Sequence, residues 1–154
     1  MKITVYSIGK TKENYVLIGE TKYLKRLKNR AKIEIEEIIN KGASTDPKAR
    51  MLKEADLILD RIKESAFLIA LDERGENLSS EKFSEFLGNK MTAGISHFVF
   101  VIGGAFGLHE KIRKRANYIM SLSKMTFPHE LARLFLIEQI YRAFSIQNNE
   151  PYHK

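Results

Sequence analysis

The segment SKMTFPH (residues 123–129) places a hydroxyl, an ammonium, a thioether, an aromatic ring and an imidazole in one short connector. Pro128 suits the first position of a helix and Glu130 its first turn, so a helix begins here. The helix dipole disfavours the charged form of His129, which leaves a neutral ring able to accept a proton or a hydrogen bond. His129 is therefore a candidate proton acceptor; a solvated histidine in a first turn is the commoner alternative.

The glycine-rich stretch GGAFG contains Gly103, Gly104 and Gly107 and follows a buried strand candidate. Ligands bind at such positions in open α/β folds, because glycine backbone allows close approach. The stretch lacks both the full dinucleotide fingerprint and the lysine and hydroxyl of a phosphate loop. It indicates either a ligand site of undefined identity or glycines that serve a tight turn.

Two basic clusters and the C-terminal tail (NNEPYHK, residues 148–154) offer contacts for a polyanion, although solvated helix faces and a frayed tail are the ordinary alternatives. The second cluster adjoins the glycine stretch, which favours a phosphate backbone passing over that site. In the tail, Tyr152, His153 and Lys154 supply a stacking surface, a polar ring and a charge suited to single-stranded bases. The clusters are Lys22, Lys25, Arg26, Lys28, Arg30 and Lys32, then Lys111, Arg113, Lys114 and Arg115.

Other chemistries have little support in this sequence. The four histidines (His97, His109, His129 and His153) show no metal-ligand spacing and no carboxylate cluster, so no metal site is expected. No nucleophile elbow or paired-acid signature indicates a hydrolase.

The whole chain has 154 residues, a formal net charge of +7 and no cysteine. The charge indicates a polyanionic partner, most commonly nucleic acid. The missing thiols exclude disulfides and fit a reducing compartment. No signal peptide or membrane span is expected, so we expect a cytoplasmic protein.

Strand-like and helix-like segments alternate along the chain, which predicts one α/β domain over residues 1–154. Its core is a parallel sheet of about five strands with helices on both faces. The predicted strands are residues 2–8, 32–39, 66–71, 97–104 and 117–123. The predicted helices are residues 13–31, 48–62, 81–91 (capped by Ser80), 108–116 and 128–147.

The last predicted helix is apolar nearly all round, which requires burial nearly all round. One sheet covers only one side, so the other side is expected to pack against a second copy of the chain in a homodimer. Its apolar residues are Leu131, Leu134, Phe135, Leu136, Ile137, Ile140, Tyr141, Phe144 and Ile146.

FVFVIGGAFGL (residues 98–108), LSKMTFPHELARLFLIEQIYRAF (residues 122–144) and the terminal EPYHK resemble the ribosomal RNA large subunit methyltransferase H family. These SPOUT-class enzymes methylate N3 of a pseudouridine in 23S rRNA. TKYLKRL near the start matches too, so the resemblance spans the chain, although residues 40–60 carry less of it. Ala105 is a mild departure, since the family usually has Ser or Pro there.

The resemblance implies a C-terminal trefoil knot, a homodimer, S-adenosyl-L-methionine (SAM) as cofactor, and 23S rRNA in the ribosome or large subunit as partner. It implies cofactor contacts from three segments: Leu71; Gly103 and Gly104; and Leu122, Ser123, Lys124, Met125, Thr126 and Phe127.

On this interpretation His129 handles the N3 proton, with Tyr152 and His153 as competing candidates. Arg133, Arg142 and Lys154 are expected to contact the substrate, although Arg142 has an alternative partner in Glu138 at i, i+4. The alternatives from other classes are a non-enzymatic RNA-binding or ribosome-assembly factor and an α/β nucleotide-binding oxidoreductase.

Overall fold

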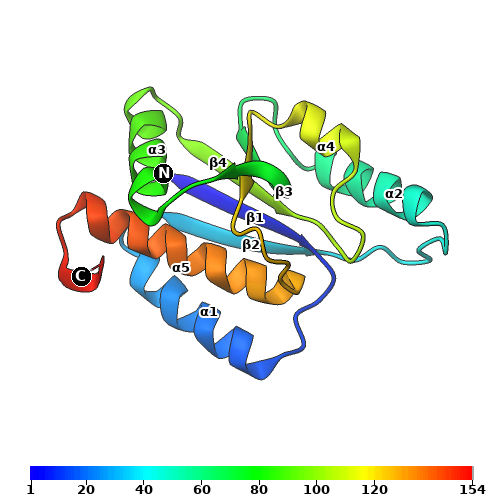
Figure 1. Ribbon diagram of the computed structural model, residues 1–154, viewed down its shortest axis with the longest axis horizontal. Coiled ribbons are helices and arrows are strands. Elements are labelled where there is room, and N and C mark those ends of the chain that lie inside the picture. Colours follow the sequence, from blue (N-terminus) through cyan, green and yellow to red (C-terminus); the bar gives the residue numbers. More distant parts are fainter. Residues whose placement is uncertain (154) are drawn as a thin grey trace.

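The computed structural model describes residues 1–153. It contains a five-stranded sheet of order β2-β1-β4-β3-β5, in which every pairing is parallel (Figure 1). The strands are β1 (Lys2–Ile8), β2 (Lys32–Ile38), β3 (Phe67–Asn77), β4 (His97–Ile102) and β5 (Tyr118–Ser121). The helices are α1 (Asn14–Leu27), α2 (Pro47–Leu59), α3 (Ser80–Thr92), α4 (Glu110–Arg115) and α5 (His129–Gln147), followed by the 3-10 turn η1 (Pro151–His153).

Helices cover both faces of the sheet, as predicted. Successive side chains of a strand point to opposite faces, so Val5 and Phe100 pack against α1, α3 and α5, whereas Tyr6 and Val101 pack against α2 and α4. The continuous apolar runs of β3 and β4 follow from this, because a strand covered on both faces has no solvent side.

Two helix beginnings refine the sequence analysis. Ser79, rather than Ser80, caps α3 by accepting a hydrogen bond from the Lys82 N–H at 3.2 Å. The Ser80 hydroxyl is directed to α5 instead, where it donates to Gln139 at 2.7 Å. Pro128 stands at the N-cap of α5, so that His129 is the first helical residue.

β3 is longer than predicted because its charged second half, expected as a loop, also pairs with β5. Met120 of β5 aligns with Leu71 and again with Glu76, on either side of a bend in β3. The two backbones meet closely at Gly75, where a β-carbon would lie 2.5 Å from the Met120 carbonyl carbon. Residues 72–77 (DERGEN) show no alternation of apolar and polar side chains, so they form a strand because they pair with β5. The predicted knot in this region stays a prediction.

α5 lies on the sheet between α1 and α3 (Figure 1). These two helices cover the flanks of α5, which the sequence analysis expected a second copy of the chain to cover. Leu136, Ile137 and Ile140 are fully buried within one chain. The apolar circumference of α5 is therefore explained largely within the chain, except for a strip that includes Phe135, which is 40% exposed.

In residues 1–153, no helix combines the length and the apolar character that crossing a membrane requires.

Candidate active site

The three predicted cofactor segments meet at the carboxyl edge of the sheet. Leu71 of β3 aligns with Ile102 of β4 on one side and with Met120 of β5 on the other. Gly103 follows Ile102 directly, and Leu122 begins one residue after β5 ends. Strand register thus brings together segments that are about 30 and 20 residues apart in sequence, at the edge where open α/β sheets bind ligands.

The glycine turn after β4 closes so tightly that it needs glycine. A β-carbon at Gly103 would lie 2.7 Å from the Gly107 carbonyl oxygen, and Gly107 has a φ of +80°. Gly104 touches the end of β1, where a β-carbon would lie 3.1 Å from Ile8 Cγ2. The sequence left two roles open for these glycines, a tight turn and a ligand site, and the structure is compatible with both. The glycines close the turn, and Gly103 and Gly104 are half-exposed, so their backbone is open to a ligand.

The connector between β5 and α5, residues 122–127, is an irregular loop with most of its backbone open. The Ser121 hydroxyl donates to the Ser123 carbonyl, and the Ser123 hydroxyl accepts from the Met125 N–H, each at 2.9 Å. Within residues 1–153, no other backbone N–H of this connector has a hydrogen-bond partner. Met125 is 76% exposed.

These residues fit an adenosyl cofactor by the chemistry of their groups. Leu71 and Leu122 are half-exposed apolar side chains, and both loops present open backbone donors and acceptors beside them. Apolar walls with a few convergent polar groups are typical of small-molecule sites.

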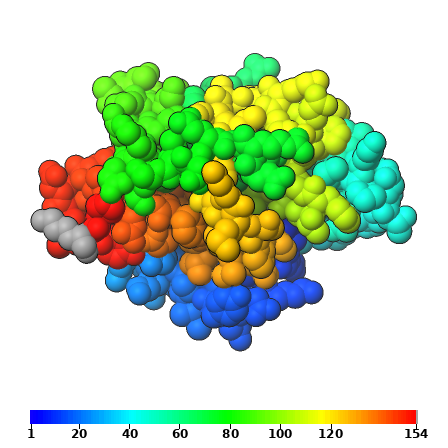
Figure 2. Space-filling model, viewed as in Figure 1, coloured from blue at the N-terminus to red at the C-terminus, as the bar shows by residue number. Residues whose placement is uncertain are grey.

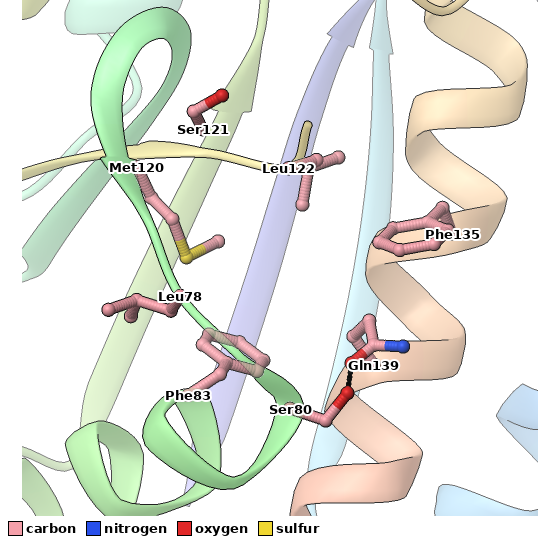
Figure 3. A pocket seen from close by; sticks show the side chains of 8 residues that line it. All are labelled: Leu78, Ser80, Phe83, Met120, Ser121, Leu122, Phe135 and Gln139. Atoms are coloured by element: carbon pink, nitrogen blue, oxygen red, sulfur yellow. Dashed lines mark hydrogen bonds between the residues drawn. The ribbon is translucent and has the colours of Figure 1, made fainter. Parts of the chain in front are cut away.

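A hollow lies beside this edge, between α3, β5 and α5 (Figure 3). Its volume is about 70 Å³, which suits a few water molecules rather than a whole nucleoside. Leu122 and Phe135 contribute to its wall, but Leu71 and Gly103 do not. The predicted cofactor segments are therefore brought together by strand register, and the hollow is a neighbouring surface depression.

His129, the predicted proton acceptor, lies in the first turn of α5 at the carboxyl end of β1. Its ring packs against Gly9, where a β-carbon would lie 3.6 Å from His129 Nε2. Gly9 has a φ of +86°, which also favours glycine. The next residue, Glu130, accepts a hydrogen bond from the Lys12 N–H at 2.8 Å. The imidazole therefore borders the loop between β1 and α1.

Arg133, predicted to contact substrate, is 2% exposed and is bound to protein groups instead. Its guanidinium donates to both carboxylate oxygens of Glu20, at 2.6 and 3.0 Å, and to Glu37 at 2.9 Å. Burial opposes the charge of Arg133, but these two carboxylates outweigh it and raise the pKa of the guanidinium. A buried, fully engaged guanidinium has no contact to offer RNA, so the expected direct role of Arg133 is replaced by a structural one.

The C-terminal tail packs on the protein up to His153, rather than fraying. The Tyr152 hydroxyl donates to Glu138 at 3.0 Å and lies 3.1 Å from the Tyr23 hydroxyl, while His153 Nε2 lies 2.7 Å from Glu81. Burial, reinforced by the bonds with Tyr23 and Glu138, raises the pKa of Tyr152. The phenol therefore stays protonated at neutral pH, which weighs against Tyr152 as a proton acceptor. Lys154 lies outside the described residues.

Arg142 forms the i, i+4 pair with Glu138 that the sequence analysis named as its alternative, with Nη2 at 2.6 Å from Oε1. Its guanidinium also stacks over the Tyr152 ring, 4.9 Å from the centroid. Hydrogen bonding with Glu138 raises the pKa of Arg142.

Within residues 1–153, the tail and His129 are not brought together in one chain. Glu138, the contact of Tyr152, is nine positions after His129 on α5, about 13 Å further along the helix axis. The structure therefore groups the predicted residues into two sets: the cofactor edge with His129, and the tail with Arg142.

The two basic clusters differ in how their charges are compensated. On α4, Lys111 pairs with Asp56, Arg113 with Asp72 and Lys114 with Glu110, while Arg115 donates to backbone carbonyls such as that of Glu64. In the first cluster Arg30 pairs with Glu150 and Lys32 with Glu34. The exposed Lys22 and Lys25 of α1 and Lys28 at its C-cap, by contrast, have no ion-pair partner among residues 1–153. The exposed cations without an ion-pair partner thus lie on α1 and at its C-cap, whereas the phosphate backbone expected beside the glycine turn stays a prediction.

The buried network around Arg133 is a structural feature that the sequence analysis missed. One signal was available: Glu20 lies four residues after Val16 and seven before Leu27, so it interrupts the apolar stripe of α1. A carboxylate on a buried face requires a buried cation, but the sequence does not say which one.

No group of three or more His, Cys, Asp or Glu side chains in residues 1–153 is arranged to hold a metal ion.

The fold is a parallel sheet in which the connectors after β3, β4 and β5 meet at one edge. Comparison with known protein families identifies the class of protein that has this fold. A family model described as "Predicted SPOUT methyltransferase" matches residues 1–153. SPOUT methyltransferases in general use SAM as the methyl donor.

Individual relatives narrow the assignment within this class. A protein of Clostridium perfringens named "Ribosomal RNA large subunit methyltransferase H" is 46% identical over 159 aligned residues, covering 100% of both chains. Proteins with the same name from Streptococcus sanguinis and Carboxydothermus hydrogenoformans are 45% and 43% identical, also over 100% of both chains. This chain belongs to the ribosomal RNA large subunit methyltransferase H family.

Proposed function

We propose that this protein transfers a methyl group from SAM to N3 of a pseudouridine in 23S rRNA. The observation that carries the proposal is the register that aligns Leu71 with both Ile102 and Met120. That alignment supports one cofactor site built from Leu71, Gly103, Gly104 and residues 122–127. The names of the relatives support ribosomal RNA as the substrate.

Backbone groups of the glycine turn and of residues 122–127 would hold the adenosine and methionine parts of the cofactor, with Leu71 packed against it. When bound, SAM supplies an electrophilic methyl group on a positively charged sulfonium. The protein mainly has to hold the two reactants in position and shield them from water. The trefoil knot implied by the family would fix the connectors after β3, β4 and β5 relative to one another.

His129 is our candidate for accepting the N3 proton. Its imidazole stands in the first turn of α5 and packs against Gly9, beside the loop between β1 and α1. Tyr152 is held protonated and His153 lies against Glu81, so the tail is better suited to contacting the base than to accepting a proton. Arg142 and Lys154 remain candidate substrate contacts.

The exposed cations of α1 are the proposed contact for the rRNA backbone. Lys22, Lys25 and Lys28 share that surface with Arg26, whose guanidinium stacks over the rings of Tyr141 and Tyr152. Uncompensated lysines and arginines beside aromatic rings suit a phosphate backbone with unstacked bases. Action on ribosomes or large subunits implies a cytoplasmic location.

The active unit is proposed to be a homodimer. On the face shown in Figure 2, α5 (orange) is visible between α1 (blue) and α3 (green), with the β5–α5 connector lying across it. Phe127, in the connector, stacks on Phe135 of α5, and Ile18 of α1 is 70% exposed. Exposed apolar side chains of this kind are typical of interfaces. A second copy would also bring a tail to the His129 site, which residues 148–153 of the same chain do not reach.

A non-enzymatic RNA-binding factor is the alternative favoured by the α1 surface alone. Two measurements test the choice: calorimetric titration with SAM, and transfer of labelled methyl groups from SAM to isolated ribosomes and large subunits. We expect SAM binding and incorporation into 23S rRNA. RNA binding without either result would support the alternative.

A further inference from the structure

Arg133 connects four separate elements through one buried guanidinium. Besides Glu20 on α1 and Glu37 on β2, it donates to the Ser7 hydroxyl at the end of β1, at 3.0 Å, and to the Thr11 hydroxyl. Every partner of Arg133 except Glu20 lies at or just beyond the carboxyl end of β1 or β2.

The loop between β1 and α1, residues 9–13, is tied down by the same groups. Glu37 accepts from the Thr11 N–H at 2.9 Å, and Thr11 also accepts from Arg133 through its hydroxyl. Glu130, on the first turn of α5, accepts from the Lys12 N–H. The loop is thereby held to α5 at two points, one of them through Arg133.

Two functional groups border this tether. The His129 ring packs against Gly9, and the loop carries two exposed lysines, Lys10 and Lys12. A shift of the loop relative to α5 would move these cations with respect to the imidazole.

Stability alone is a weak reason for such a network. Removing two carboxylates and a guanidinium from water costs free energy that their attraction often fails to recover, and apolar replacements of similar volume are often as stable. A buried arrangement with five hydrogen bonds from Arg133 does, however, impose a single geometry on the groups it joins.

We infer that Arg133 is a positioning residue for methyl transfer, which holds the loop of residues 9–13 against the first turn of α5 and so fixes His129 and the loop lysines on one side of the RNA site. This inference rests on the proposed function. It assigns Arg133 no contact with cofactor or RNA.

The test compares Arg133→Lys and the milder Thr11→Val, which removes one tether and leaves the buried ion pairs intact, with the unsubstituted protein. Three quantities are measured below the unfolding temperature: SAM affinity by calorimetry, kcat and KM for ribosome methylation, and amide hydrogen exchange of residues 9–13. Leu68→Ala, which truncates a fully buried side chain on the opposite face of the sheet, is the control for lost stability.

Both variants are expected to retain SAM affinity within about twofold while kcat falls by about tenfold or more, because small misplacements of a reacting group are costly. Exchange of the loop amides should become faster in both. Leu68→Ala should leave kcat and loop exchange unchanged while the protein stays folded. A third variant, Arg133→Met, should lower kcat the most. If that variant fails to fold, the kcat and loop exchange of Thr11→Val decide whether Arg133 is a positioning residue.

Unchanged kcat and KM in Thr11→Val and Arg133→Lys, or loop exchange equal to that of the unsubstituted protein, would overturn the positioning role. An unsubstituted protein that methylates no ribosome would instead overturn the proposed function, and the inference with it. The two failures are therefore distinguishable.

Discussion

At the residue scale, His129 is the side chain on which the proposed chemistry depends most. It borders Gly9 and the loop of residues 9–13, at the end of α5 that follows the connector of residues 122–127. Its position is set by backbone, because Gly9 leaves room for the ring.

His129→Gln is expected to lower kcat for methyl transfer by about a hundredfold or more, since a positioned base typically contributes that much. The affinity for SAM should stay the same, because the imidazole is assigned to the proton and not to the cofactor. Single-turnover methylation with preformed enzyme–SAM complex measures this. A normal single-turnover rate would remove His129 from the mechanism.

Gly103 is expected to tolerate no side chain. Gly103→Ala would drive a β-carbon to within 2.7 Å of the Gly107 carbonyl oxygen, and forced overpacking of this kind costs about 1–3 kcal/mol. The turn should shift and SAM affinity should fall, as measured by calorimetry.

The matched control is Gly88→Ala in α3, where the added methyl group meets only the end of Gln147 at 3.4 Å. Helix propensity should make it neutral or stabilising by up to about 1 kcal/mol, as thermal unfolding would report. Gly103→Ala with unchanged SAM affinity would argue that the turn is not part of the cofactor site.

At the element scale, the second half of β3 is held over β5 partly by one hydrogen bond. The Tyr118 hydroxyl donates to Glu76 at 2.7 Å. Burial, then this bond to Glu76, raises the pKa of Tyr118 to about 12. The ordinary value is near 10, so the folded state favours the protonated phenol.

The stabilisation from Tyr118 should therefore be complete below about pH 10 and should be lost as the pH rises through about 12. Ultraviolet titration of the phenols should show late-ionising tyrosines, Tyr118 and Tyr152 among them, and Tyr118→Phe should remove the one that ionises near pH 12. Hydrogen exchange of residues 72–77 should accelerate over the same pH range. A Tyr118→Phe protein with an unchanged titration curve would contradict the assignment.

The elements also show how far sequence reasoning reaches. Apolar runs without alternation predicted the central strands, and capping residues placed α5 within one residue, because burial and helix ends leave local signals. The Leu71, Gly103 and 122–127 segments were grouped through family resemblance, and the register then brought them together.

Features that depend on distant partners were not predictable in the same way. The second half of β3 is a strand only because β5 passes beside it, and Arg133 looks like a surface cation until Glu20 and Glu37 are placed around it. Likewise, Lys111 and Arg113 of α4 pair with the distant Asp56 and Asp72, and only the Glu110–Lys114 pair of that helix is local.

At the scale of the whole molecule, the exposed strip along α5 is the proposed dimer interface. Phe135→Lys should place a charge in that interface and convert a dimer of twice 17.8 kDa into a monomer, as light scattering after gel filtration would measure. Methylation should be lost along with the dimer if a second copy supplies the tail.

The control is Leu52→Lys, which places the same charge at an exposed leucine of α2 on the opposite face. It should remain dimeric and active. A monomeric unsubstituted protein that is fully active would refute the shared site.

The most direct test of the central claim is mass-spectrometric mapping of modified nucleosides in 23S rRNA from cells with and without this protein. The account predicts that one N3-methylated pseudouridine is present with the protein, is replaced by unmethylated pseudouridine without it, and returns on complementation. Retention of that methyl group in cells lacking the protein, or loss of a different modification, would contradict the account.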